Sequence, residues 1–347
     1  MTENFEIYNA LPQRLLPWYG ENARDLPWRR DRDPYRVWVS EIMLQQTRVE
    51  AVIGYYDRFM KAFPTVVALA EAEEAQVLKL WEGLGYYSRA RNLQKAAKVI
   101  AFGLHGVFPD TEETLLKLPG VGAYTAGAVA SICFERPTAA VDGNVLRIIT
   151  RMTADARPID LNATKQDIAA RLKAVYPEGA CGDFTQALME LGACVCTPKS
   201  PKCESCPMQA HCKAHAEKKE TAFPVKLPKK EKRVEERTVF LLCADGRYAV
   251  CRREEEGLLA GLWQFPNCPG ALCASDAVLW AKDAQPHEII KEVRRTHIFT
   301  HIRWEMTGYL LTCDTACAPY IWVTKEEIEN KYTLPTAFRM FLSDLEA

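Results

Sequence analysis

The chain has 347 residues, of which 48% are hydrophobic and 26% charged, and its formal net charge is −1. This composition excludes a disordered or fibrous chain and is typical of a globular protein large enough for two cores. A net charge near zero does not exclude nucleic-acid binding, because a basic face can be balanced by acidic residues elsewhere.

No apolar run approaches the length of about 18 residues that a membrane helix needs. The start, MTENFEIYNA, has neither the basic region nor the apolar core of a signal peptide. We therefore expect a cytoplasmic protein that does not enter a membrane. Thirteen cysteines in such a chain argue against a disulfide scaffold and favour a search for metal ligands.

The first 60 residues are predicted to be helical. Asp33-Pro34 predicts the start of a helix over YRVWVSEIMLQQ, with Asp33 as N-cap and Pro34 at the first helical position. Inside it, the carboxylate of Glu41 is surrounded by apolar residues. A glutamate in a helix is most often solvated, so composition alone does not mark Glu41 as catalytic.

Two further helices, over residues 66–80 and 91–102, bracket the loop GLGYYSRARN. In this loop Tyr86 and Tyr87 lie beside Arg89. Aromatic rings next to arginine are typical of surfaces that stack on bases and hold phosphates, although tyrosines in a loop are as often simply packed.

Residues 118–145 read LPGVGAYTAGAVASICFERPTAAVDGNV, which predicts a short helix, a glycine turn and a second helix from Tyr124 to Phe134. Gly120 and Gly122 would let the N–H groups around Val121 converge where the second helix presents its positive end. Such a turn suits a DNA phosphate, but a lone GxG is more often an ordinary helical hairpin.

Asp142 precedes Gly143 and Asn144 and is predicted to be the N-cap of the next helix. Backbone N–H groups that donate to a carboxylate favour its ionised form. The structural role of Asp142 and a chemical role as an anion are therefore compatible.

Four cysteines, Cys196, Cys203, Cys206 and Cys212, follow the spacing C-x6-C-x2-C-x5-C. Four thiolates can bind either zinc or a [4Fe–4S] cluster, and chemistry alone does not decide between them.

After the cysteines, a basic, proline-bearing linker leads to a region of strands. The linker is either a solvated tether or a segment that follows DNA. Two apolar runs flank Asp245-Gly246, which predicts a β-hairpin, and a helix near 275–282 and strands over 296–311 complete an α+β domain.

The strings LPGVGAYTAGA, VSEIMLQQTRV and GLLAGLWQFP, together with the cysteine spacing, resemble the MutY-type adenine DNA glycosylases. The resemblance covers most of the chain, from about Arg24 to the strands over 296–304. It implies an all-α helix-hairpin-helix glycosylase domain of two lobes over residues 1–215, with a [4Fe–4S] cluster loop at 196–212. A charged linker over 216–235 and an α+β Nudix-like lesion-recognition domain over 236–347 follow.

The resemblance implies an enzyme that flips adenine out of double-stranded DNA and hydrolyses its bond to the sugar where it is mispaired with 8-oxoguanine or guanine. Glu41 would protonate the base and Asp142 would stabilise the oxocarbenium ion. Tyr124 stands where strand-cutting relatives carry a lysine nucleophile, which implies a monofunctional glycosylase. We expect a monomer in the cytoplasm, associated with the nucleoid if the source is bacterial.

The resemblance assigns further residues to four groups. Asn144 would assist Asp142. The adenine pocket would include Arg24, Trp28, Tyr124 and Gln186. The stack around the lesion would include Gln46, Thr47 and Tyr86, and the lesion itself would be read by Phe299, Thr300 and His301, where the family usually has Phe-Ser-His. A DNA phosphate would bind at Gly120, Val121 and Gly122.

Three alternatives remain open. An endonuclease III-like pyrimidine or thymine-mismatch glycosylase would share the helical domain. A non-enzymatic binder of damaged DNA could retain the fold, although both carboxylates are present. A Nudix hydrolase is disfavoured because the REXXEE helix that holds its metal does not follow Pro266.

Overall fold

The computed structural model describes residues 2–228 and 231–345, which divide by packing into two compact units. One unit is Met1–Ala72 with Asn92–Pro228, and the other is Glu73–Arg91 with Lys229–Ala347. The predicted domain boundaries, with 73–91 inside a first domain, remain a proposal. Among the described residues, no helix combines the length and apolar character of a membrane span.

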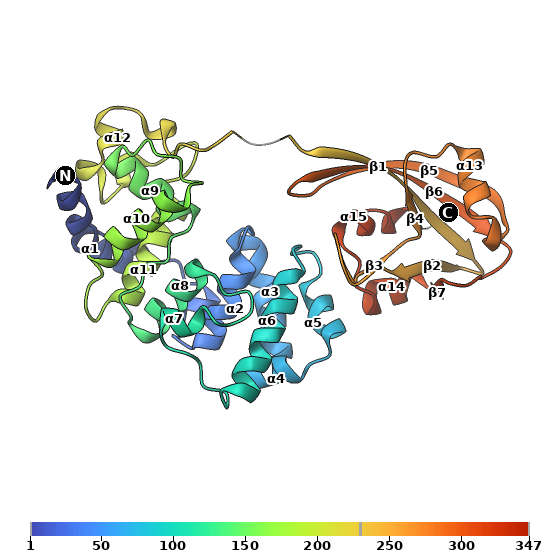
Figure 1. Cartoon of the computed structure of the whole chain (residues 1–347), viewed down its shortest axis with the longest axis horizontal. Helices are drawn as coiled ribbons and strands as arrows, with labels where there is room; N and C mark the ends of the chain where they lie inside the picture. Colours follow the sequence, from blue (N-terminus) through green and yellow to red (C-terminus); the bar gives the residue numbers. More distant parts are fainter. Residues whose placement is uncertain (1, 229–230, 346–347) are drawn as a thin grey trace. The chain divides into compact units, whose positions relative to one another are not determined.

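The described part of the first unit is helical and has no strand (Figure 1). Its helices are α1 (Thr2–Asn22), α2 (Pro34–Leu44), α3 (Val49–Ala62), α4 (Val66–Glu71), α6 (Ser88–Lys98, which begins in the other unit), α7 (Glu112–Leu115), α8 (Ala123–Phe134), α9 (Gly143–Thr153), α10 (Asn162–Lys173), α11 (Cys181–Glu190) and α12 (Lys213–Ala216).

Side-chain caps mark several helix starts, and the two predicted caps, Asp33 and Asp142, are confirmed. Asp33 accepts a bond from the Arg36 N–H at the start of α2, Thr111 caps α7, and Asp142 caps α9. The single helix predicted over 66–80 is wrong. It is two helices, α4 and α5 (Glu74–Trp81), because Ala72 and Glu73 adopt extended backbone angles that sequence propensity did not indicate.

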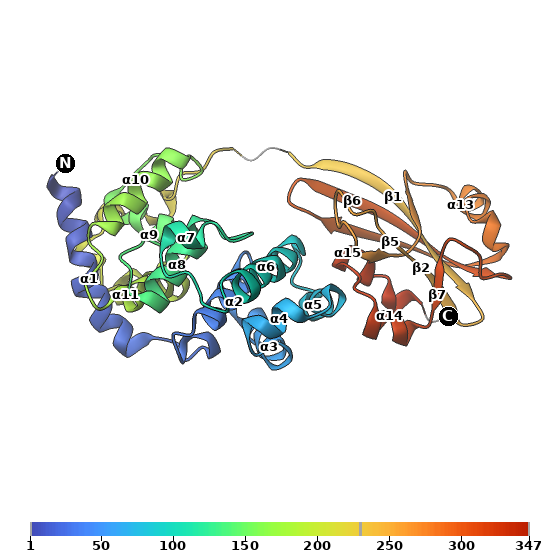
Figure 2. The same cartoon turned by 60° about the horizontal axis from the view of Figure 1, so that its bottom comes forward.

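The core around α9 positions the later site residues. α1 packs against α11, as Figures 1 and 2 both show, and their apolar residues meet those of α9 in one buried cluster. Part of the predicted linker also belongs to this unit, since Val225 O accepts from the Ile159 N–H and Phe223 O accepts from Arg151.

The second unit contains a sheet in the order β3-β2-β1-β6-β5, with β4 and β7 pairing off this path. The strands are β1 (Arg233–Ala244), β2 (Arg247–Arg252), β3 (Trp263–Gln264), β4 (Asn267–Pro269), β5 (Pro286–Ile298), β6 (Ile302–Cys313) and β7 (Ile321–Val323). The predicted hairpin at Asp245-Gly246 is confirmed, since both residues have positive φ and Ala244 pairs with Arg247.

Helices cover both faces of this sheet. Val239 and Leu241 share a buried cluster with residues of α14 (Lys325–Lys331) and α15 (Thr336–Arg339), whereas Phe240 and Leu242 share one with residues of α13 (Ala274–Trp280). Figure 1 shows where these helices lie on the sheet. Successive residues in the second half of β1 are therefore buried on opposite faces, and this half reads as a continuous apolar run.

Gly127 in α8 gives a test of the packing in the first unit. A Cβ at this position would lie 2.7 Å from the carbonyl oxygen of Ala139, which is backbone and cannot rotate away. We expect Gly127→Ala to destabilise the unit by about 1–3 kcal/mol, measured as a lower thermal midpoint. Gly54→Ala in the exposed middle of α3 is the matched control and should raise stability by about 0.5–1 kcal/mol. Equal effects of the two changes would contradict this packing.

Candidate active site and cluster site

One cavity of about 150 Å³ in the first unit is lined by all of the predicted catalytic and adenine-binding residues. A single buried water needs only about 15 Å³, so the space suits a larger group. The predicted residues that line it are Arg24, Trp28, Glu41, Thr47, Tyr124, Asp142, Asn144 and Gln186. These residues come from segments far apart in the sequence, which meet when α2, α8, α9 and α11 pack together.

Glu41 is the central carboxyl group of this cavity. It lies on α2, is only 4% exposed, and accepts a hydrogen bond of 2.7 Å from the Tyr124 hydroxyl. Burial raises the pKa of Glu41 to about 7, the Tyr124 bond opposes the rise, and the charge of Asp142 adds to it. Glu41 can therefore hold or release a proton near neutrality, which a general acid needs.

Tyr124 is the donor in this pair and remains protonated. Burial and the charge of Glu41 raise the pKa of its phenol well above the ordinary value. Its O–H therefore stabilises the carboxylate form of Glu41.

Asp142 accepts three hydrogen bonds at the start of α9. They come from Asn144 N at 2.9 Å, Asn144 Nδ2 at 2.8 Å and Val145 N at 2.8 Å. Burial raises the pKa of Asp142, and the three hydrogen bonds lower it. Burial is the larger effect, so the pKa of Asp142 lies above its ordinary value. The hydrogen bonds orient both carboxylate oxygens.

The support of Asp142 continues to the cysteine loop. Arg147 donates to Asn144 Oδ1, to Gly192 O and to Cys196 O, each at 2.8 Å. A Cβ on Gly192 would lie 2.6 Å from the Cβ of Asn144, so glycine is needed for this close approach. The first cysteine of the loop and the Asp142 cap are thus held by one guanidinium.

Sequence reasoning missed a buried ion-pair network behind the pocket. Glu190 is fully buried and accepts from Arg24 at 2.6 Å and from Arg29 at 2.8 Å. Burial disfavours its charge, but the two arginines outweigh this effect and the pKa of Glu190 is lowered. Because Glu190 follows Gln186 by four residues on α11, helical spacing could have indicated it.

Arg29 also lines the pocket, and its Nη1 is buried without a hydrogen-bond partner among the described residues. A buried unpaired donor is costly, so an acceptor atom on a bound molecule would satisfy it. Nearby, Gln186 accepts from the Tyr19 hydroxyl at 3.2 Å, and Trp28 packs edge-on against Tyr56. These contacts fix two of the predicted pocket residues.

The four cysteines of the C-x6-C-x2-C-x5-C run line one mostly apolar cavity. Arg151, buried in α9, donates to Cys196 Sγ at 3.3 Å and to the carbonyl oxygens of Thr197 and Pro198. An iron–sulfur cluster is held by four cysteine thiolates, and four cysteines line this cavity. The Arg151 cation that donates to Cys196 Sγ also suits a thiolate ligand.

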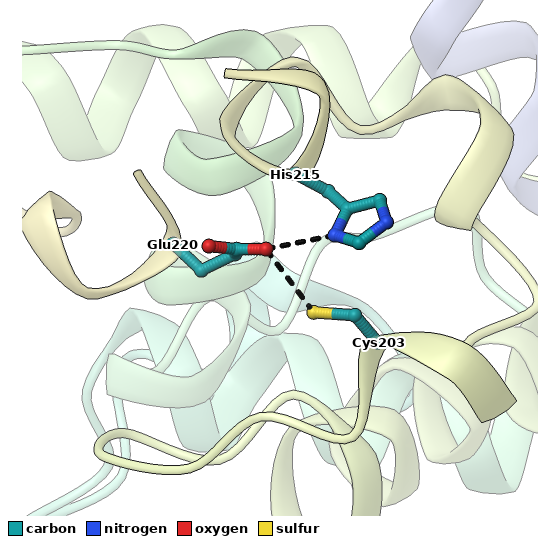
Figure 3. A group of neighbouring side chains, drawn as sticks. All are labelled: Cys203, His215 and Glu220. Carbon is teal, nitrogen blue, oxygen red and sulfur yellow. Dashed lines mark hydrogen bonds and ion pairs between the residues drawn. The ribbon is translucent and has the colours of Figure 1, made fainter. Parts of the chain in front are cut away.

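A second group beside Cys203 belongs to the same site. Glu220 accepts from His215 Nδ1 at 2.7 Å and from the Cys203 thiol at 3.7 Å (Figure 3). These three residues could in principle bind a metal, but Cys203 is already one of the four cysteines around the cavity. We therefore assign Glu220 and His215 to the surroundings of that site.

The predicted phosphate turn lies apart from the pocket. Gly120 has φ of +75°, and a Cβ there would lie 2.5 Å from Asn92 Cβ, so this position requires glycine. Gly122 instead has extended angles as the N-cap of α8, and the Val121 N–H donates to Leu118 O. Of these three residues, Val121 therefore has its N–H occupied, and the first turn of α8 supplies further donors for a phosphate.

Apart from Thr47, the residues predicted to stack around the lesion or to read it do not line the pocket. Gln46 is exposed in the first unit and has φ of +59°. Phe299, Thr300 and His301 form the turn between β5 and β6. In the second unit, the Tyr86 hydroxyl lies 3.0 Å from Thr300 Oγ1, so the structure brings these two predicted residues together.

Comparison with known proteins identifies the same regions. Residues 39–177 match the HhH-GPD superfamily of base excision DNA repair proteins, 196–212 the iron-sulfur binding domain of endonuclease III, and 238–344 the NUDIX domain. The iron–sulfur match begins and ends at the first and last of the four cysteines, and this site binds a [4Fe–4S] cluster.

Two curated adenine DNA glycosylases are similar to the chain over most of its length. The one from Arabidopsis thaliana is 38% identical over 86% of this chain and 56% of its own, so the chain spans little more than half of that relative. The one from Rattus norvegicus is 36% identical over 92% of this chain and 75% of its own.

Among solved structures, a thermostable thymine-DNA glycosylase is similar with a TM-score of 0.56 and 30% identity, covering 61% of this chain and 98% of that one. It matches only part of the chain, whereas the adenine DNA glycosylases also match beyond the helical unit. The chain therefore belongs to the adenine DNA glycosylases, DNA N-glycosylases of the helix-hairpin-helix base excision repair superfamily that carry a [4Fe–4S] cluster and a C-terminal Nudix-like domain.

Proposed function

We propose that this protein removes adenine mispaired with 8-oxoguanine or guanine in double-stranded DNA, by hydrolysing the N-glycosidic bond and leaving an abasic site. The observation that carries this proposal is the buried Glu41 carboxyl, with a pKa raised to about 7, in a cavity that also contains a second carboxylate. Paired carboxyl groups with different environments suit glycosidic-bond cleavage.

Glu41 acts as the general acid. Its carboxyl proton passes to a ring nitrogen of the flipped adenine, N7 by the family resemblance, and the electrons of the C–N bond leave with the base. The Tyr124 hydroxyl, 2.7 Å from Glu41 Oε2, stabilises the carboxylate that remains. That carboxylate then accepts a proton from the attacking water.

Asp142 stabilises the positive charge that develops on the sugar. Its three hydrogen bonds fix the carboxylate against one face of the cavity, so little reorganisation is needed when the charge forms. Asn144 supplies two of these bonds and is a positioning residue for Asp142.

Arg29 and the pocket residues bind the base. The unpaired Nη1 of Arg29 donates to an acceptor nitrogen of adenine, while Gln186, Trp28 and Arg24 fix the ring. A base pocket with unpaired donors favours the purine whose acceptors satisfy them. The [4Fe–4S] cluster ties residues 196–212 into one loop when bound, and Arg147 and Arg151 hold that loop against α9.

The enzyme is monofunctional in this proposal. Tyr124 lies at the hairpin position of the lyase lysine, and a phenol cannot form a Schiff base with the sugar. The turn at Phe299, Thr300 and His301 reads 8-oxoguanine on the opposite strand. The protein acts as a monomer in a reducing compartment such as the cytoplasm, where the four cluster cysteines stay reduced.

The substrate assignment is tested by single-turnover base release from duplexes with adenine opposite 8-oxoguanine, guanine, cytosine or thymine, and with thymine opposite guanine. We expect adenine to be released fastest opposite 8-oxoguanine, with strand cleavage only after alkali. Release of thymine would instead favour a thymine-mismatch glycosylase, and cleavage without alkali would contradict the monofunctional mechanism.

The acid role of Glu41 predicts a pH profile. Because the protonated form is required, the single-turnover rate should be flat below about pH 7 and fall about tenfold per pH unit above it. Tyr124→Phe removes the donor that favours the carboxylate, so the pKa of Glu41 should rise and the falling limb should move to higher pH.

Glu41→Gln should reduce the rate by at least about 100-fold at every pH. Tyr35→Phe is the matched control, because the Tyr35 hydroxyl is buried and donates to Phe63 O outside the pocket, and it should leave the profile unchanged. A Tyr124→Phe profile that superimposes on the wild-type profile would exclude Glu41 as the titrating acid.

A further inference from the structure

The segment Glu73–Arg91 contains a strained loop. Gly83 and Gly85 have φ of +104° and +70°, and Tyr86, which follows them, has φ of +47°. A tyrosine in the left-handed region is unfavourable and persists only where its surroundings hold it. By packing, the segment belongs to the second unit, and contacts within that unit hold the loop in place.

A buried carboxylate precedes the loop directly. Glu82 has a side chain that is only 8% exposed, and it accepts from Leu334 N at 2.7 Å, Lys79 Nζ at 2.9 Å and Arg339 Nη1 at 2.9 Å. Two cations and one backbone donor therefore surround a single carboxylate. We call Lys79, Glu82, Leu334 and Arg339 the Glu82 anchor.

The anchor is reinforced on both sides of the loop. Lys79 Nζ also donates to Tyr332 O at 3.0 Å, just beyond the end of α14. After the loop, Arg91 donates to Ala260 O and to Glu74, both at 2.9 Å. The loop is thus fixed at each end to the body of the second unit.

The fixed loop presents Tyr86 at one place. The tyrosine is 47% exposed, and its hydroxyl lies 3.0 Å from Thr300 Oγ1 in the turn between β5 and β6. We propose that the Glu82 anchor is a specificity-determining device, which sets the preference for 8-oxoguanine over guanine by holding Tyr86 against Thr300. This inference rests on the proposed function, in which that turn reads the oxidised base.

The anchor should act on lesion preference and not on adenine removal. Every residue that lines the adenine cavity lies in the first unit, whereas all four anchor residues lie in the second. Preference for 8-oxoguanine over guanine is a difference between two binding free energies. If the contacting groups must first be ordered at binding, that cost is subtracted from the energy of the specific contacts and the preference falls.

Glu82→Gln isolates the ionic part of the anchor. A glutamine keeps an oxygen for the Leu334 N–H but leaves Lys79 and Arg339 without a carboxylate. Glu255→Gln is the matched control in the same unit, since Glu255 pairs with Arg252 at 3.0 Å on an exposed surface. Arg339→Leu, alone and combined with Glu82→Gln, completes a double-mutant cycle.

The experiment uses the full-length, cluster-containing protein. Dissociation constants are measured for duplexes with an uncleavable adenine analogue opposite 8-oxoguanine or guanine, together with single-turnover adenine release opposite guanine. Amide hydrogen exchange of residues 83–88 is measured in parallel. For Glu82→Gln we expect the affinity ratio of 8-oxoguanine to guanine to fall about tenfold, a change of roughly 1.4 kcal/mol.

In Glu82→Gln, amide hydrogen exchange of residues 83–88 should become faster. The rate of adenine release opposite guanine should stay within about twofold of the wild-type rate, which corresponds to less than about 0.5 kcal/mol in activation free energy. Glu255→Gln should change none of these values, and Arg339→Leu should add little to Glu82→Gln. An unchanged affinity ratio, or an equal loss of adenine release, would overturn the inference. A wild-type protein without any preference for 8-oxoguanine would instead overturn the proposed function.

Discussion

The proposed chemistry of this protein depends on a carboxyl group that is buried away from water. Glu41 is almost fully buried, and burial is the largest effect on its pKa, which rises to about 7. A fully apolar surrounding would trap the neutral acid, because the carboxylate left after proton transfer would have no donor. Tyr124 supplies that donor and so makes both protonation states accessible. The geometry of the pocket follows from the need to hold these two side chains 2.7 Å apart on different helices.

Buried charged groups near the site are hydrogen-bonded to their neighbours, and these bonds connect the site to its scaffold. Glu190 is neutralised by Arg24 and Arg29, and Asp142 is linked through Asn144 to Arg147. Removing one partner from such a network leaves an uncompensated charge, which costs more than the pair contributes. The hydrogen bonds from Asp142 through Asn144 to Arg147 continue to Cys196, the first cysteine of the cluster loop, so the cluster site and the proposed active site share one support.

The proposed adenine site and the proposed lesion-reading residues lie in different units. The cavity with both carboxyl groups lies in the first unit, while the Phe299 to His301 turn and the strained Tyr86 loop lie in the second. In the proposed function, two binding surfaces on separate units would allow the removed base and the opposite base to be recognised independently. In the sequence, the segment Glu73–Arg91 stands between the two stretches that form the first unit. In the structure it packs with the second unit.

The sequence by itself determined the local features. Caps such as Asp33 and Asp142, the hairpin at Asp245-Gly246 and the cysteine spacing depend on neighbouring residues, and all could be predicted from short strings. Only the tertiary structure decided which polar groups are buried and paired. Glu190, Arg29 and the Glu82 anchor bring together residues up to 257 positions apart. The raised pKa of Glu41 is of the same kind, because burial is a property of packing and no local pattern encodes it.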